Sequence, residues 1–203
     1  MDALAAWLTG GSVLEVAPTL LGATLRHETY DGTVAVRLTE VEAYAGPDDP
    51  GSHAFRGPTA RNATMFGPPG HLYVYLIYGA HHCCNVVVGG EGNASAVLLR
   101  AGHVVEGAEL ARARRGGGTD RDLARGPGRL CQALGITRAH DGADLRRGPV
   151  RLDRSEEVTS VEHGPRVGLR AAADHPWRFW IPGEASVSRY VPAKARVRRT
   201  TGT

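Results

Sequence analysis

The sequence lacks long apolar runs and paired cysteines. No stretch approaches the roughly 18 uncharged apolar residues of a membrane-spanning helix, so we expect no membrane contact and a cytoplasmic location. The three cysteines are an odd number without a CxxC pair, which disfavours a disulfide framework and predicts reduced thiols. The 203 residues, 42% of them hydrophobic, suffice for one buried core. We therefore expect a single domain over residues 1–203, frayed at 1–11 and 197–203.

Lysine is almost absent as well, because Lys194 is the only one among 24 cationic residues. Arginine, which holds phosphates in a planar fork, supplies the remainder and is unevenly spread. Residues 1–50 contain two arginines against eight acidic residues, whereas residues 100–154 contain twelve against seven. This asymmetry suits a polyanionic partner, although a compositional bias of the genome explains arginine richness equally well.

Hydrophobic periodicity and turn-forming residues predict an α+β fold with a mostly antiparallel sheet. Asp31-Gly32 separates two β-rich segments and predicts a hairpin, and a second hairpin is expected from residues 72–88. The segment 45–70 is too rich in glycine and proline for regular structure. The expected elements are helices at 12–21, 104–115 and 126–135 and strands at 23–30, 33–44, 72–78, 83–88, 95–101, 150–152, 166–169 and 178–181.

The strand at 33–44 carries the first candidate site. Strict alternation places its even-numbered side chains on one face, so that an apolar surface ends in Glu40, Glu42 and Tyr44. A carboxylate at the edge of a core is partly desolvated and rigidly held, as a general base requires. The alternative is a pair of solvated carboxylates on an exposed strand.

Tyrosines are concentrated in the segment 72–78. Tyr73 and Tyr75 are expected to face one way and Tyr78 the other, at the tip of the second hairpin. Stacking on tyrosine rings is a common way to hold nucleobases, so this cluster favours a nucleic-acid site. The alternative is a tyrosine-rich strand pair that packs against the preceding loop.

The run His81-His82-Cys83-Cys84 raises the question of a metal site. Adjacent residues on a strand point to opposite faces, so at most two of these four side chains converge, and no CxxC or HxxxH spacing supplies more ligands. We expect no metal. A phosphate-binding GxxxxGK[ST] loop is also missing, which disfavours nucleotide hydrolysis.

A series of linked motifs occurs in order between residues 39 and 133, and the match covers most of residues 18–182. They are TEVEAYAGPDD at 39–49 with His53, RN at 61–62, MFGPPG at 65–70, YVYLIYG at 73–79 with Asn85, VLLRA at 97–101 and GPGRLCQA at 126–133. Together they resemble the alkyladenine (3-methyladenine) DNA glycosylase family. This resemblance implies a curved antiparallel sheet with peripheral helices, a protruding DNA-binding β-hairpin and no cofactor.

The resemblance also implies roles for residues in the chemistry and in the base pocket. Glu42 is expected to deprotonate the attacking water, and Arg100 to hold that water or a nearby phosphate. Tyr44, His53 and Tyr75 are expected to form the walls between which an everted base is stacked.

Further implied roles concern selectivity and the DNA itself. Asn85 matches the family's gatekeeper position, where its amide crowds the 2-amino group of normal guanine. Tyr78 resembles the wedge that fills the gap left in the duplex. The expected contacts with the DNA backbone are Arg61, Met65 and Arg129.

These expectations describe a monomeric enzyme, associated with the nucleoid when bound, that starts base excision repair on damaged double-stranded DNA. Its expected substrates are 3-methyladenine, 7-methylguanine, hypoxanthine and ethenoadenine. Because Lys194 lies in the tail, no lysine is placed for Schiff-base chemistry, and a monofunctional glycosylase is expected. The alternatives are a non-catalytic damaged-DNA-binding protein and a metal-dependent hydrolase that uses His81 and Cys83.

Overall fold

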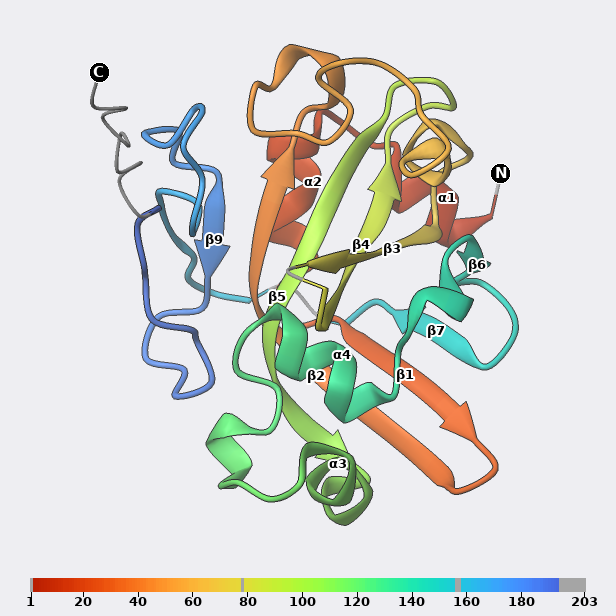
Figure 1. Cartoon of the computed structure of the whole chain (residues 1–203), viewed down its shortest axis with the longest axis vertical. Coiled ribbons are helices and arrows are strands. Elements are labelled where there is room, and N and C mark those ends of the chain that lie inside the picture. The colour runs from red at the N-terminus through yellow and green to blue at the C-terminus, as the bar shows by residue number, and fades with distance from the viewer. Residues whose placement is uncertain (1, 78, 156–157, 194–203) are drawn as a thin grey trace, which may run out of the picture.

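Within the part of the chain that the structure describes, nine strands form one antiparallel sheet (Figure 1). The computed structural model describes residues 2–77, 79–155 and 158–193. The strand order is β6-β3-β4-β5-β2-β1-β7, and β9 pairs with both β2 and β8 beside this row. The strands are β1 (Thr24–Thr29), β2 (Gly32–Tyr44), β3 (His71–Ile77), β4 (His81–Val88), β5 (Ser95–Glu106), β6 (Ala143–Asp144), β7 (Val150–Asp153), β8 (Glu162–Gly164) and β9 (Arg178–Trp180).

The helices in the described residues are few and short, which together with the antiparallel sheet confirms the predicted α+β class. They are α1 (Ala3–Leu8), α2 (Val13–Thr19), α3 (Ala108–Arg115) and α4 (Pro127–Leu134), with 3₁₀ turns η1 (Gly46–Asp48), η2 (Ala63–Phe66), η3 (Asp120–Asp122) and η4 (Arg138–His140). The helices predicted at 12–21 and 126–135 are therefore confirmed. No described helix is both long and apolar enough to cross a bilayer.

Two predicted elements differ from the structure. The helix predicted at 104–115 starts only at Ala108, because β5 runs on to Glu106 and Gly107, at φ 72°, makes the turn between them. The strand predicted at 166–169 is wrong, since this segment is a turn between β8 and β9. Arg166 in this turn is buried through side-chain contacts rather than strand pairing.

Residues 3–8 form the helix α1 inside the segment 1–11 that the sequence predicted to be frayed, and residue 1 lies outside the described residues. The Asp2 side chain caps α1, and Trp7 and Leu8 are buried. Trp7 donates a hydrogen bond from its indole nitrogen to the Thr19 hydroxyl at 2.7 Å, which ties α1 to α2. A six-residue helix is too short to show a clear period, but an anchored tryptophan is enough to hold it. The other predicted frayed segment, 197–203, lies outside the described residues.

Two adjacent β-bulges change which side of the sheet β2 presents to the core. Leu38 pairs with Gly102 but Glu40 pairs with Ala101, so Thr39 is an extra residue in β2, and one position further on Arg100 is an extra residue in β5. Core positions accordingly switch from even to odd numbers: Val34, Val36 and Leu38, then Val41 and Ala43. The prediction that all even-numbered residues share one face is wrong, because strict alternation does not hold across a bulge.

Because of the bulges, the even-numbered side chains at the end of β2 point to the face of the sheet opposite the main core. The main core on one face combines residues of all four α-helices with strand residues such as Leu72, Val86 and Leu99. A smaller cluster, including Tyr73 and Met65, lies on the other face. Alternation in β3 is regular, so Tyr73 and Tyr75 point the same way, as predicted.

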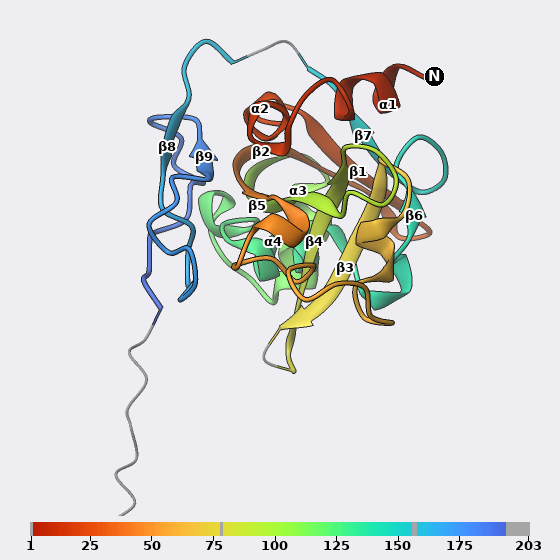
Figure 2. The ribbon, with the colours of Figure 1, turned by 90° about the horizontal axis from the view of Figure 1, so that it is seen from above.

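The β3–β4 hairpin extends beyond the body of the fold (Figure 2), as the sequence resemblance implies. Its strands pair in register from Leu72 with Val86 to Ile77 with His81. The intervening Gly79 and Ala80 are exposed. Tyr78, the predicted wedge, lies outside the described residues, and its role remains a prediction.

Candidate active site

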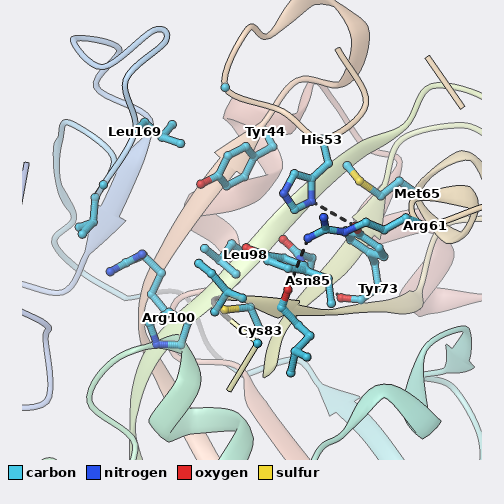
Figure 3. A pocket seen from close by; sticks show the side chains of 18 residues that line it. Tyr44, His53, Arg61, Met65, Tyr73, Cys83, Asn85, Leu98, Arg100 and Leu169 are labelled. Carbon is cyan, nitrogen blue, oxygen red and sulfur yellow. Dashed lines mark hydrogen bonds between the residues drawn. The ribbon is translucent and has the colours of Figure 1, made fainter. Parts of the chain in front are cut away.

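A cavity of about 510 Å³ opens beside the β3–β4 hairpin, on the face of the sheet opposite the main core. Its walls come from the loop 45–66, from strands β3 to β5 and from the turn 167–169 (Figure 3). The volume lies in the usual range for small-ligand pockets. The predicted site residues that line it are Tyr44, His53, Arg61, Met65, Tyr75, Asn85 and Arg100.

Glu42 is buried directly behind this cavity and has no exposed surface. Its Oε1 accepts a hydrogen bond from the Val167 amide at 2.7 Å and lies 3.3 Å from Arg100 Nη1. Its Oε2 accepts a hydrogen bond from the Tyr44 hydroxyl at 2.9 Å. All three partners line the cavity, whereas Glu42 itself does not. They hold its carboxylate in one orientation behind the lining residues, and a general base needs such fixed placement.

Arg100 bridges Glu42 and a second buried carboxylate, Glu40. Its Nε donates to Glu40 Oε1 at 2.8 Å, while its Nη1 faces Glu42. Burial alone would lower the pKa of Arg100, but the two carboxylates raise it above the ordinary arginine value. The guanidinium is therefore a permanent positive charge, aimed at Glu42 from the bulge in β5.

Aromatic rings form one side of the cavity. Tyr73 and Tyr75 are stacked with ring centroids 5.6 Å apart, and the His53 ring meets Tyr75 edge-on at 4.5 Å. The His53 Nδ1 atom lies 3.1 Å from the Tyr73 hydroxyl, which fixes the imidazole against the strand. In Figure 3 His53 lies beside Tyr73, whereas Tyr44 lies apart from them on another side of the cavity.

The phenols of Tyr44 and Tyr75 and the imidazole of His53 are uncharged near pH 7. Burial raises the pKa of Tyr44 and of Tyr75 well above the ordinary phenol value, with smaller contributions from Glu42 in both cases. Burial, followed by the charge of Arg61, lowers the pKa of His53 below its usual 6.5. His53 is therefore an uncharged imidazole, able to donate one hydrogen bond and accept another.

Residues 7–185 match the sequence profile of the family described as methylpurine-DNA glycosylase (MPG). The chain belongs to the methylpurine-DNA glycosylase family. Several relatives carry the name "Putative 3-methyladenine DNA glycosylase", and three of them illustrate the similarity. The protein of Streptomyces avermitilis is 55% identical over 93% of this chain and 92% of its own length, and that of Leifsonia xyli subsp. xyli 56% identical over 88% of each. The protein of Rhodopseudomonas palustris is 51% identical over 90% of this chain and 88% of its own length.

Family membership makes the protein a DNA glycosylase, an enzyme of DNA repair that binds DNA and hydrolyses an N-glycosidic bond. This decides between the alternatives that the sequence left open, since a non-catalytic binding protein has no such activity. Among the described residues, no three side chains of His, Cys, Asp or Glu are grouped as a metal site would need.

Asn85 lies at the base of the glycosylase's cavity and is 5% exposed. Its Nδ2 donates to the Tyr73 carbonyl oxygen at 3.2 Å, and it pairs with Leu98 across the β4–β5 ladder. Cys83, on the same side of β4, also lines the cavity. Burial raises the pKa of the Cys83 thiol to about 11, so it is an uncharged thiol at neutral pH.

The three residues expected to contact the DNA backbone lie in different settings. Arg61 is exposed at the cavity, with its Cζ 5.9 Å from the Tyr75 ring centroid. Met65 is 3% exposed and packs in the smaller cluster beside Tyr73. Arg129 is half-exposed near the start of α4, 3.6 Å from Asp122. Their contacts with DNA remain predictions.

The sequence did not predict the buried ion pair that anchors the turn beside the Glu42 carboxylate. Arg166 binds Asp49 through both terminal nitrogens, at 2.5 and 2.8 Å, and its Cζ lies 4.6 Å from the centroid of the Tyr44 ring. The next residue is Val167, whose amide holds Glu42. A Cβ at Gly51 would lie 2.8 Å from the Arg166 Nη2, so a larger residue there would force Arg166 to shift. No local pattern pairs positions 117 residues apart.

Proposed function

We propose that this glycosylase everts alkylated or deaminated purines from damaged double-stranded DNA and hydrolyses their N-glycosidic bond without cutting the strand. The proposed substrates are 3-methyladenine, the base named for the relatives, and 7-methylguanine, hypoxanthine and ethenoadenine. The observation that carries this proposal is the buried carboxylate of Glu42, which is held by Tyr44, Arg100 and Val167, three residues that line a cavity with aromatic side chains. The enzyme acts as a monomer on cytoplasmic, nucleoid DNA.

Eversion is needed because the glycosidic bond of a stacked base is out of reach. Extrusion loses a few kcal/mol of stacking and pairing, which a damaged base has partly lost already. The protruding β3–β4 hairpin is suited to enter the minor groove, and a side chain at its tip would keep the duplex open. Tyr78 is the proposed wedge. Selectivity for damage begins at this step.

Hydrolysis passes through a sugar cation that resembles an oxocarbenium ion. In our proposal the ionised Glu42 stabilises that cation and deprotonates a water on the face of the sugar away from the departing base. Arg100, fixed 3.3 Å from Glu42, helps to position the water. The single lysine, Lys194, lies outside the described residues, and a free water rather than an amine is the proposed nucleophile.

The cavity offers separate means of holding charged and neutral lesions. Adenine methylated at N3 and guanine methylated at N7 are cationic while attached to the sugar, and the faces of Tyr44 and Tyr75 attract them through cation–π interactions. Neutral hypoxanthine instead needs a hydrogen-bond donor, which the uncharged His53 supplies in our proposal.

A panel of duplexes, each with one lesion, tests this proposal directly. Base release is scored as alkali-labile abasic sites, with a parallel assay without alkali. We expect release of several of the four proposed bases, and no strand cleavage before alkali. Release of none of them, or strand cleavage without alkali, would contradict the proposal.

Replacing Asn85 with serine tests the gatekeeper role. Serine removes the amide that is expected to crowd the guanine 2-amino group, so we expect guanine excision opposite thymine to rise by at least about 10-fold, or about 1.4 kcal/mol. Release of hypoxanthine serves as the control and should change less than roughly threefold. Guanine excision at the wild-type level would remove Asn85 from this role.

Replacing Arg61 with glutamine tests the predicted phosphate contact. Losing one such contact reduces the slope of log Kd against log salt by about 1 and weakens binding of damaged and undamaged duplexes alike. Arg151→Gln, on the exposed part of β7, is a matched control that should leave the slope unchanged. An unchanged slope for Arg61→Gln would exclude the phosphate contact.

A further inference from the structure

Glu40 is a fully buried carboxylate that receives four hydrogen bonds. Oε1 accepts from Arg100 Nε at 2.8 Å, from Arg178 Nε at 2.7 Å and from the Ser188 hydroxyl at 2.8 Å, and Oε2 accepts from the Ser188 amide at 2.6 Å. Burial alone would raise the pKa of Glu40, but Arg100 and Arg178 together lower it. Glu40 is therefore a permanent negative charge.

Glu40 and Glu42 share Arg100, and Arg178 stands opposite Glu42 in the β2–β9 ladder. Two carboxylates and two guanidiniums thus form a buried group with no net charge. The guanidinium group is planar and Arg100 contacts a different carboxylate with each of two nitrogens, so the position of Arg100 depends on both carboxylates.

The other titratable groups near Glu42 do not alter this balance. Tyr44 on β2, Tyr75 on β3 and Cys83 on β4 have raised pKa values and are uncharged near neutral pH. Arg166, in the turn that also carries Val167, is charged but is paired with Asp49.

We propose that Glu40 is a positioning residue for base release, which holds Arg100 against Glu42 and neutralises the second arginine, Arg178. This inference rests on the proposed role of Glu42. With Glu40 neutral, the buried group carries one excess positive charge beside the site where the sugar cation develops. That charge opposes the cation and lowers the rate, and it favours the ionised form of the neighbouring carboxylate.

The test compares single-turnover base release by Glu40→Gln with the wild type across pH 4 to 9. From one unit charge at a distance of several Å in a partly buried setting, we expect the plateau rate to fall about 10- to 100-fold. We expect the acidic limb of the profile to move to lower pH, by at least about half a unit. An acidic limb at the wild-type pH would overturn the proposal.

The double variant Glu40→Gln/Arg178→Met separates charge balance from structural damage. It restores a neutral group, so its acidic limb should return to the wild-type position and its plateau should exceed that of Glu40→Gln at least about threefold. If the losses of plateau rate in Glu40→Gln and Arg178→Met simply add in the double variant, the role of Glu40 is structural and the proposal fails. Ser188→Ala, which removes a hydrogen bond to Glu40 without a change of charge, is the control and should keep the limb in place.

Thermal unfolding of each variant accompanies the kinetics. If Glu40→Gln does not fold, the double variant and Arg178→Met still decide the question, because Arg178→Met alone leaves one excess negative charge. Its acidic limb should move to higher pH, and an unmoved limb would contradict the proposal. Glu42→Gln is assayed in parallel. If Glu42→Gln is active, the proposed role of Glu42 as the general base is wrong. If Glu42→Gln is inactive and the acidic limb of Glu40→Gln does not move, only the present inference is wrong.

Discussion

Glu42→Gln should lower the rate of base release at least about 1000-fold. General-base catalysis typically contributes 10²- to 10⁴-fold, and an electrostatic contribution to the sugar cation is lost with the same charge. Glutamine has nearly the shape of glutamate, so the cavity and its aromatic walls are retained. Affinity for damaged duplexes should therefore stay within roughly threefold of the wild type. Single-turnover release from a hypoxanthine duplex, with binding measured separately, gives both quantities.

Glu28→Gln is the matched control, because it makes the same chemical change on the neighbouring strand β1. Glu28 lies on the surface, paired with Arg151 at 3.0 Å, and its replacement should leave the rate within about twofold. Turnover by Glu42→Gln near the control rate would show that another group activates the water. If Glu42→Gln lost both DNA binding and turnover, the carboxylate would instead be needed to maintain the structure of the cavity.

Arg166→Met should produce the largest loss of stability. The Arg166 and Asp49 side chains are wholly buried, so removing one partner leaves an uncompensated charge in the interior. Such changes cost about 3 to 5 kcal/mol in the free energy of unfolding. For a chain of this size the expected fall in Tm is roughly 6 to 20 °C. Base release should also slow, because Val167 follows Arg166 directly and its amide holds Glu42.

Two variants make this expectation specific. Arg151→Met removes an exposed ion pair, in which both side chains are about 45% exposed, and should change stability by less than about 1 kcal/mol. Arg166→Met/Asp49→Asn removes both buried charges and should be less destabilised than the two single variants added together. A melting temperature for Arg166→Met equal to that of Arg151→Met would show that the buried pair adds no stability.

Much of the candidate site could be predicted from local sequence. The Asp31-Gly32 turn fixes the β1–β2 hairpin, and alternation along β3 places Tyr73 and Tyr75 on one side. The resemblance of the linked motifs to a glycosylase family supplied Arg100 and Asn85 as site residues, and both line the cavity. These successes rest on features with a short range along the chain.

The face on which Glu42 lies could not be predicted by the same means. Alternation placed Glu42 on the core side of β2 with Val34, yet the bulge at Thr39 moves it to the cavity side. A bulge depends on pairing with β5, which begins more than 50 residues later. The bulge matters for function, because it directs Glu42 away from the main core and toward the side of the cavity.

The amino-acid sequence by itself determined the fold class, the family and most of the side chains around the cavity, because strand periodicity, turn residues and linked motifs are written in neighbouring positions. Only the tertiary structure decided how Glu42 is held. Its partners Val167 and Arg100, and the charges at Glu40 and Arg178 behind them, meet through bulges, a buried ion pair and strand β9. Such contacts join distant parts of the chain, and burial, which gives them their strength, exists only after folding.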